Sequence, residues 1–313
     1  MIKILVTGGA GNIASALIAK LAENSANHIT IADNLLTGDM SKVPMDKNNV
    51  QFIKCDVNNY NDISPLFFAN SFEYVFHFAA VVGVQRTLQN PLWVMNDIHG
   101  IEHVLNLSKN TGVRRVYYSS SSEVYGEPFE IPQNEQTTPL NSRLPYAIVK
   151  NVGEAFLRTY YREFGLDYQI FRFFNTYGPN QSEDFVVPRF IRQAMANDDI
   201  TIYGDGSQTR TFCYVDDNVE ACINAHHSGL FENDTINIGS DVEYTIQSLA
   251  EKIIEVTGSS SKIINLPALA EGDMTRRKPD ISKMKQLLNH DLLPLEEGVR
   301  RLAEHFEKTP SVS

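Results

Sequence analysis

The stretch Lys3-Ile4-Leu5-Val6-Thr7-Gly8-Gly9-Ala10-Gly11-Asn12-Ile13-Ala14 decides the fold of this chain. A short apolar run typical of a buried strand leads directly into a Gly-x-x-Gly-x-x-Ala run that opens a helical pattern. Because glycine has no Cβ, the backbone at Gly8 and Gly11 can turn tightly and approach a pyrophosphate, whose charge the helix N-terminus stabilises. A Gly-rich turn that binds no ligand would also fit this run, so the neighbouring sequence must distinguish the two interpretations.

An acid after the second apolar run supplies that context. Asp33 lies about twenty residues beyond the glycines, where a carboxylate can accept hydrogen bonds from an adenosine ribose. A carboxylate there repels a 2′-phosphate, so the sequence favours NAD over NADP as the cofactor. Asp56 is expected on the adenine side, with a helix-capping or turn role as the alternative. The expected cofactor contacts in this region are Gly8, Gly11, Asn12, Ile13, Asp33, Asn34, Asp56 and Val57.

Outward from this unit, short runs rich in Val, Ile, Phe and Tyr alternate with longer helical patterns, which is typical of a parallel sheet buried on both faces. Right-handed crossovers then predict an α/β fold with a Rossmann-like, doubly wound sheet. After about Gly178 the alternation loosens, which predicts a smaller C-terminal substrate lobe. We expect a cofactor domain over residues 1–178, with later segments near 208–240 returning to it, and the lobe over 179–313.

Individual elements follow from the same patterns. Strands are predicted at Lys3–Thr7, His28–Ala32, Val50–Cys55, Tyr74–Phe78, Arg115–Ser119, Asp167–Phe173 and Ile200–Tyr203. Helices are predicted at Asn12–Glu23, Tyr60–Ala69, Pro91–Thr111, Tyr146–Phe164 and Val186–Ala196.

The composition of the chain limits the kinds of partner that it is expected to bind. The 313 residues carry a formal charge of −11, from 27 basic and 38 acidic side chains, whereas binding to a phosphate backbone needs the opposite balance. We therefore expect no nucleic acid. No run reaches the roughly 18 to 20 apolar residues of a membrane helix, and the N-terminal run is interpreted as a strand, so no membrane is expected. Three widely spaced cysteines fit neither a disulfide framework nor a zinc ribbon, which predicts a cytoplasmic location.

One motif resembles a metal site. The run from His99 to His103 has the His-x-x-Glu-His spacing of some zinc proteases, but the glycine inside it makes a poor metal scaffold. We expect no metal.

A second group of residues has side chains suited to proton transfer. Four serines, Ser119 to Ser122, end the fifth strand and precede Glu123, and Tyr146 and Lys150 follow four residues apart, hence on one helical face. A phenol with a pKa near 10 is a poor base at neutral pH, but a neighbouring ammonium and a cationic nicotinamide both favour the phenolate. Tyr146 is therefore a candidate base.

Together these motifs resemble the extended short-chain dehydrogenase/reductases, specifically the NAD-dependent nucleotide-sugar epimerases, dehydratases and decarboxylases such as UDP-sugar 4-epimerases and UDP-glucuronate decarboxylases. The resemblance covers nearly the whole chain, with Ala14 replacing the usual third glycine and Asn12 the usual aromatic residue. It implies a homodimer formed through a four-helix bundle. It also implies a catalytic triad of Ser121, Tyr146 and Lys150, and further cofactor contacts from Phe78, Ala79, Ala80 and Asn96.

The resemblance further implies a nucleoside-diphosphate sugar as substrate. Asn175 would reach the diphosphate, Tyr203 would stack on the nucleobase, and Arg210 and Arg277 would hold phosphates. For Arg277 a surface role stays open, because the flanking basic residues could substitute. Ser122, Val187 and Arg189 complete the expected substrate contacts.

The family shares one first step. Tyr146 takes the proton of the sugar 4-hydroxyl, Ser121 bonds the same oxygen, and hydride leaves C4 to give a 4-ketosugar. For the steps that follow, we favour net 4-epimerisation, which needs only rotation of the ketosugar and return of the hydride. Whether Glu123 is catalytic or a hydrogen-bonding scaffold stays open.

Four alternatives remain. Decarboxylation of a uronate fits Ser122-Glu123 and the run from Thr275 to Asp280, but Glu183 and Asp184 stand where related uronate enzymes often place arginine and would repel a carboxylate. A net 4-dehydrogenase would release the ketosugar. A 4,6-dehydratase is disfavoured because Ser122 occupies the position of its catalytic acid. A non-catalytic NAD-binding sensor is disfavoured because such relatives typically lack the tyrosine or the lysine.

Overall fold

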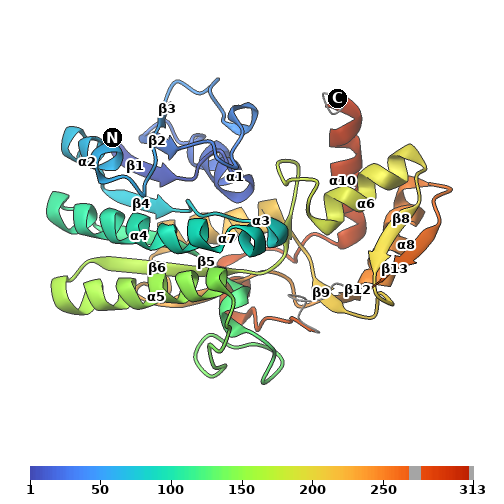
Figure 1. Ribbon diagram of the computed structural model, residues 1–313. Helices are drawn as coiled ribbons and strands as arrows, with labels where there is room; N and C mark the ends of the chain where they lie inside the picture. Colours follow the sequence, from blue (N-terminus) through green and yellow to red (C-terminus); the bar gives the residue numbers. More distant parts are fainter. Residues whose placement is uncertain (268–275, 310–313) are drawn as a thin grey trace.

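The computed structural model describes residues 1–267 and 276–309, so Thr275 lies outside the described residues. Seven parallel strands form the central sheet in the order β11-β6-β5-β4-β1-β2-β3, which confirms the predicted Rossmann-like fold (Figure 1). The strands are β1 (Ile2–Thr7), β2 (Asn27–Asp33), β3 (Val50–Lys54), β4 (Tyr74–His77), β5 (Arg115–Ser121), β6 (Asp167–Phe173) and β11 (Thr235–Ile238).

Helices cover both faces of the sheet because alternate strand residues are apolar on both sides. Leu5 of β1 lies in the core formed with one helical layer, whereas Ile4 and Val6 lie in the core formed with the other. The first layer contains α2 (Tyr60–Ala69), α4 (Pro91–Thr111) and α5 (Pro145–Phe164), seen side by side in Figure 1. The second contains α1 (Asn12–Leu21) and α7 (Val215–Ser228), which pack on each other.

The strand order reverses at β1, which lies between β4 and β2. In open parallel sheets the connections at such a point leave in opposite directions and open a crevice at the carboxyl ends of the strands. The glycine run after β1 lies at this point. The fold therefore places a ligand crevice where the sequence expects the cofactor.

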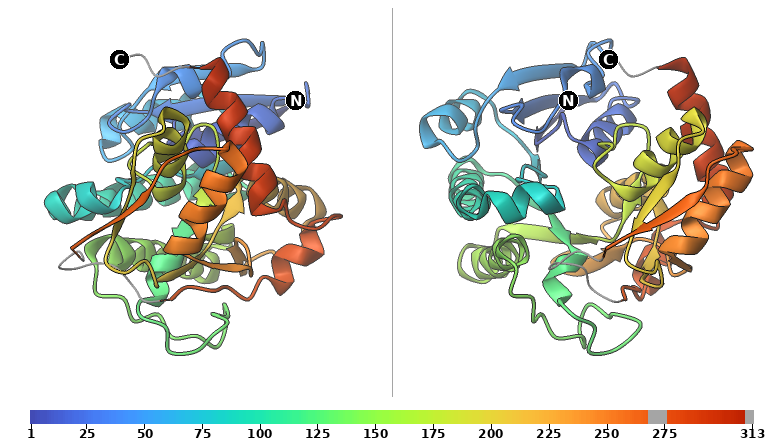
Figure 2. Two further views of the ribbon diagram at one scale, coloured as in Figure 1. Left: turned by 90° about the vertical axis from the view of Figure 1, so that its right-hand side faces the viewer. Right: turned by 45° about the vertical axis from the view of Figure 1, so that its right-hand side comes forward.

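The C-terminal lobe stands beside the sheet, at the right of Figure 1 and facing the viewer in the left panel of Figure 2. The parallel pair β8 (Ile200–Tyr203) and β13 (Ile263–Leu266) lies in it, next to the antiparallel pair β9 (Thr209–Thr211) and β12 (Glu243–Thr245). Its helices α6 (Val186–Ala196), α8 (Ile246–Thr257) and α10 (Leu295–Lys308) pack together. A further parallel pair is formed by β7 (Thr176–Tyr177) and β10 (Cys213–Tyr214).

The chain crosses between sheet and lobe more than once. From β9 it returns to the sheet as α7 and β11, goes back to the lobe as β12 and α8, and returns again as α9 (Ser282–Leu287), which packs on α7 and β11. Within the described ranges, no helix is both long and apolar enough to cross a membrane. The remaining short helices are η1 (Met40–Lys42), α3 (Val84–Gln89) and η2 (Ser122–Tyr125).

Candidate active site

The glycine run lies against the end of β4. Gly8 has a φ of +70°, and a Cβ at this position would lie 2.6 Å from the backbone of Ala79, so only glycine fits. Gly11 is the N-cap of α1 and offers no side chain to the first amide groups of the helix, which begins at Asn12 and Ile13. Uncapped amide groups at a helix N-terminus suit a pyrophosphate. The residues present therefore fit the dinucleotide predicted from the sequence.

Asp33 is buried at the end of β2, on the other side of this run. One carboxylate oxygen accepts from the Ala10 N–H at 3.0 Å and the other from the Leu35 N–H at 2.7 Å. These bonds fix the carboxylate beside the glycines, and each oxygen keeps a second lone pair for a ribose hydroxyl. Asn34 next to it accepts from the Leu36 N–H at 2.9 Å and closes a local turn.

Asp56 has the turn geometry foreseen as its alternative role. Its carboxylate accepts from the Asn58 N–H at 2.9 Å. The carbonyl of Val57 contacts Nδ1 of His103 at 3.1 Å, which gives one imidazole of the His-x-x-Glu-His run a structural partner.

The segment after β4 corrects one expectation. Phe78, Ala79 and Ala80 are half-buried as they leave the sheet, but Asn96 is exposed on α4. The buried neighbour is Asp97, whose carboxylate accepts from the Val81 N–H at 2.8 Å and from Nδ2 of Asn58 at 3.2 Å. The helical period predicts this difference. The buried positions of α4 recur three to four residues apart, and Asp97 falls on one of them whereas Asn96 does not. They are Val94, Asp97, Ile101 and Val104.

The predicted triad comes together at the carboxyl end of β5. Lys150 is buried on α5, donates to the Ser119 carbonyl at 2.6 Å, and its Nζ lies 5.7 Å from the centre of the Tyr146 ring. The Ser121 hydroxyl lies near enough to the Tyr146 hydroxyl to lower the pKa of the phenol. One helix face and one strand end thus present a phenol, a hydroxyl and an ammonium to the same spot.

The electrostatics of this triad differ from the expectation. Burial raises the pKa of Tyr146 well above its usual value, Glu123 raises it further, and the Ser121 hydroxyl and Arg277 oppose the rise. Lys150 is not among the main causes of this shift. Burial lowers the pKa of Lys150 itself to about 8, against an opposing effect of Asp97. A phenolate therefore depends on additional positive charge, which a bound oxidised nicotinamide carries.

Glu123 and Arg277 form an ion pair beside the triad, in which the arginine is buried and the glutamate half-buried. Nη1 of Arg277 lies 2.8 Å from Oε1 of Glu123, and the arginine is 6% exposed. Glu123 is also tied to the triad, because its N–H donates to Oγ of Ser121 at 3.2 Å. Its second carboxylate oxygen is buried and has no hydrogen-bond partner among residues 1–267 and 276–309. Arg277 thus lies at the reacting end of the site and not on the surface.

The basic neighbours of Arg277 are engaged elsewhere. Arg276 makes two bonds to the carboxylate of Glu243, at 2.6 and 2.7 Å, and Nζ of Lys278 lies 3.6 Å from the same carboxylate. Both side chains are thereby directed to β12, so neither takes the place of Arg277.

Of the other predicted substrate contacts, four lie on elements of the lobe, whereas Asn175 follows β6 and Ser122 lies on η2. The guanidinium of Arg189 lies 5.9 Å from the centre of the Tyr203 ring. Asn175 donates to the Thr211 carbonyl at 3.0 Å, and the buried Arg210 donates to the Thr209 carbonyl at 2.8 Å. Val187 and Ser122 are buried on α6 and η2.

The two acids that were expected to repel a substrate carboxylate are exposed. Glu183 pairs with Arg192 at 2.9 Å, and Asp184 lies 3.9 Å from Arg86. Their charges are partly neutralised and screened by solvent, so the predicted repulsion is not supported by the structure.

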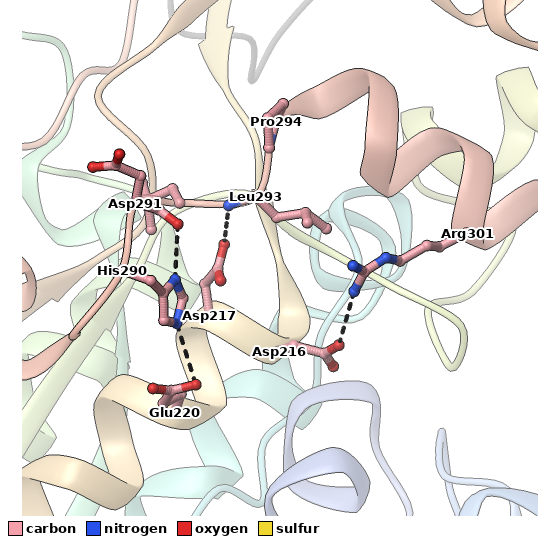
Figure 3. A pocket seen from close by; sticks show the side chains of 9 residues that line it. Asp216, Asp217, Glu220, His290, Asp291, Leu293, Pro294 and Arg301 are labelled. Carbon is pink, nitrogen blue, oxygen red and sulfur yellow. Dashed lines mark hydrogen bonds and ion pairs between the residues drawn. The ribbon is translucent and has the colours of Figure 1, made fainter.

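A pocket at the start of α7 lies apart from this site (Figure 3). Its polar groups bond to each other: Asp217 accepts from the Leu293 N–H at 2.8 Å, and Nε2 of His290 lies 3.3 Å from Glu220. Among the residues described here as its lining, none belongs to the predicted catalytic or cofactor set. They are Asp216, Asp217, Glu220, His290, Asp291, Leu292, Leu293, Pro294 and Arg301.

Comparison with known proteins agrees with this geometry. Residues 4–239, from β1 to the end of β11, match the family described as the NAD dependent epimerase/dehydratase family. The chain belongs to the NAD-dependent epimerase/dehydratase family. The predicted resemblance is confirmed, and the protein is an enzyme whose cofactor is NAD.

Members of this family differ in their final product. The UDP-N-acetyl-alpha-D-glucosaminuronate decarboxylase of Bacillus cytotoxicus is 34% identical and covers 98% of both chains. The UDP-glucuronic acid decarboxylase 6 of Arabidopsis thaliana is 36% identical over 97% of this chain and 88% of its own. The structure of a UDP-glucose 4-epimerase from Thermotoga maritima with UDP-glucose superposes with a TM-score of 0.91, at 31% identity, covering 99% and 100% of the two chains. These relatives share NAD-dependent chemistry on nucleotide sugars.

The lowered pKa of Lys150 predicts how the activity of this enzyme depends on pH. Because the pKa of Lys150 is about 8, its ammonium loses its proton as the pH rises through that value, and kcat/KM is expected to fall on the alkaline side. The Asp97 carboxylate raises this pKa, so Asp97→Asn is expected to move the alkaline limb to lower pH. Asn96→Ala, at the exposed neighbouring position, serves as the control in the same pH–rate series. An alkaline limb that stays in place in the Asp97 variant would contradict this prediction.

Proposed function

We propose that this enzyme is a decarboxylase of a nucleoside-diphosphate hexuronate, and that it oxidises C4, releases CO2 from C5 and reduces C4 again. The observation that carries the proposal is the buried Arg277, paired with the half-buried Glu123 beside Tyr146. A substrate carboxylate enters a buried site only with a cationic partner, and a guanidinium is a planar fork that matches a carboxylate. In contrast, a neutral hexose requires no such cation at C6.

The residues of the site support each step. NAD, when bound, takes a hydride from C4 at the start of the cycle and returns it at the end. Tyr146 accepts the proton of the 4-hydroxyl, with Ser121 bonded to the same oxygen. The resulting 4-ketone is β to the C6 carboxylate, so the electron pair of the C5–C6 bond moves into an enolate as CO2 leaves. The Tyr146 hydroxyl and Ser121 then stabilise the enolate oxygen, and a proton adds to C5.

Net 4-epimerisation, the reaction favoured by the sequence, is the second candidate. The observation in its favour is the close superposition on the UDP-glucose 4-epimerase of Thermotoga maritima. The same triad serves both reactions, and the difference lies in what Arg277 contacts.

Product analysis separates the candidates. The NAD-loaded enzyme is incubated in heavy water with UDP-glucuronate, UDP-N-acetylglucosaminuronate, UDP-glucose and UDP-N-acetylglucosamine, and the products are followed by NMR and by release of CO2. We expect CO2 from a uronate and a pentose product with deuterium at C5. A C4-inverted hexose without deuterium would establish epimerisation instead. Accumulation of ketosugar with reduced cofactor would indicate a 4-dehydrogenase.

We also infer that two copies associate through α4 and α5, in the cytoplasm. Support for the dimer comes from apolar side chains exposed on these helices, among them Leu92 at 81%, Trp93 at 51% and Phe164 at 55%. All three cysteines are free and buried, which suits a reducing compartment. Leu92→Glu is expected to convert the dimer to monomers in sedimentation experiments. Phe129→Glu, an equally exposed position on a loop, should leave the dimer intact, and a dimeric Leu92 variant would contradict the assignment.

A further inference from the structure

The segment that carries Arg277 is held in place by a distant loop. The Gln133 N–H donates to the Lys278 carbonyl at 2.7 Å, and the Asp280 N–H donates to the Gln133 carbonyl at 2.8 Å. Pro279, between them, lies opposite Gln133 in a parallel bridge. The position of Arg277 is therefore set by its contact with the loop that follows η2.

A single buried side chain, Asn237 on β11, joins these two segments. Its Nδ2 donates to the carbonyls of Gln133 at 2.9 Å and Asp280 at 3.2 Å. Its Oδ1 accepts from the hydroxyl of Tyr125 at 2.8 Å. The amide thus uses both its donors on the Arg277 side and its acceptor on the η2 side, and it is fully shielded from solvent.

The Tyr125 hydroxyl has a second hydrogen-bond partner besides Asn237, the guanidinium of Arg172. Its hydroxyl accepts from Nη1 of Arg172 at 2.8 Å, and Arg172 makes two bonds to the buried carboxylate of Glu154, at 2.8 and 2.7 Å. Glu154 in turn accepts from Oγ of Ser120 at 2.7 Å. Tyr125 is the last residue of η2, so this network fixes the η2 end of the turn that carries Glu123, whereas Ser121 is held by the pairing of β5 with β6. Burial raises the pKa of Tyr125 to about 12, which keeps its hydroxyl a donor at neutral pH.

We propose that Tyr125 and Asn237 are positioning residues, which hold Arg277 opposite Glu123 and so place the substrate carboxylate for loss of CO2. This inference rests on the proposed function, because it assigns Arg277 to that carboxylate. Ser121, Tyr146 and Lys150 are positioned by β5 and α5, not by residues 276–280. The two residues therefore matter for decarboxylation and much less for oxidation at C4.

The test removes one hydroxyl. In NAD-loaded Tyr125→Phe, formation of reduced cofactor after mixing with the uronate is followed by absorbance, and CO2 release is followed separately. We expect the first rate to stay within about twofold of the wild type and the second to fall by about tenfold or more, since misplacement of a reacting group by 1 Å costs up to about 100-fold. Asn237→Ala is expected to show the same pattern, with CO2 release slowed and the rate of cofactor reduction nearly unchanged.

Tyr160→Phe is the matched control, because the Tyr160 hydroxyl also donates to an asparagine, Asn106, at 2.8 Å, but far from Arg277 in the chain. Equal slowing of both steps in Tyr125→Phe, or an effect no larger than that of Tyr160→Phe, would overturn the positioning role. If Asn237→Ala does not fold, the two rates of Tyr125→Phe alone decide whether the positioning role holds. A wild-type enzyme that releases no CO2 from any uronate would overturn the proposed function and this inference with it.

Discussion

Tyr146→Phe is expected to abolish turnover while leaving NAD bound. The substitution keeps the ring, whose centre lies 5.7 Å from the Lys150 ammonium, and removes only the hydroxyl, which Ser121 influences electrostatically. A positioned general base contributes about 10² to 10⁴ in rate, so we expect kcat to fall by about 10³. The measurements are kcat with the accepted nucleotide sugar and the amount of NAD retained after gel filtration.

The control for this variant is Tyr161→Phe, which makes the same change at a half-exposed position on the same helix. It should behave as the wild type. Undiminished activity in Tyr146→Phe would eliminate the proposed base, whereas loss of both activity and NAD would indicate that the hydroxyl serves binding.

Arg277→Gln is expected to block loss of CO2 while oxidation at C4 continues. On the proposed function, the substitution leaves the substrate carboxylate without its cation, and it removes the buried partner of Glu123, although the glutamine amide can still donate to that carboxylate. We expect CO2 release to fall by about 100-fold and reduced cofactor to accumulate. Rapid-mixing absorbance and CO2 release, measured on the same sample, give the two rates.

The adjacent Arg276→Gln is the control. Arg276 is about half exposed and binds Glu243 on the surface of the lobe, so its removal should leave both rates nearly unchanged. If Arg277→Gln released CO2 at the wild-type rate, the carboxylate would have another partner and the proposed function would lose its main support.

The parts of the molecule that the sequence predicts well are those set by local patterns. Gly8 and Asp33 lie at the switch point of the sheet because a strand, a tight turn and a helix N-terminus succeed each other within one short stretch. Strand β6 and helix α2 begin and end at the predicted residues for the same reason, since apolar periodicity records which face of an element is buried.

The sequence does not predict those features of the site that depend on burial or on contacts between segments distant in the chain. Asn96 and Asp97 differ by one position, which is about a quarter turn of a helix and separates an exposed side chain from a buried one. The pairing of Glu123 with Arg277 joins segments from the two halves of the chain, and no spacing rule predicts such a contact. Burial raises the pKa of Tyr146 because neighbours from several elements exclude water there, which the Tyr-x-x-x-Lys spacing alone does not reveal.

The late return of the chain to the sheet also bears on how the protein is made. As synthesis proceeds from the N-terminus, β6 is the open edge of the sheet until Thr235–Ile238 has emerged and paired with it. Arg277 emerges later still, after Tyr146 and its partners have been able to fold. A nascent chain therefore passes through a stage in which the glycine run and Asp33 are in place without the arginine that we propose to receive a substrate carboxylate. Throughout that stage the growing protein has the residues expected to hold a dinucleotide and lacks the one proposed to direct the loss of CO2.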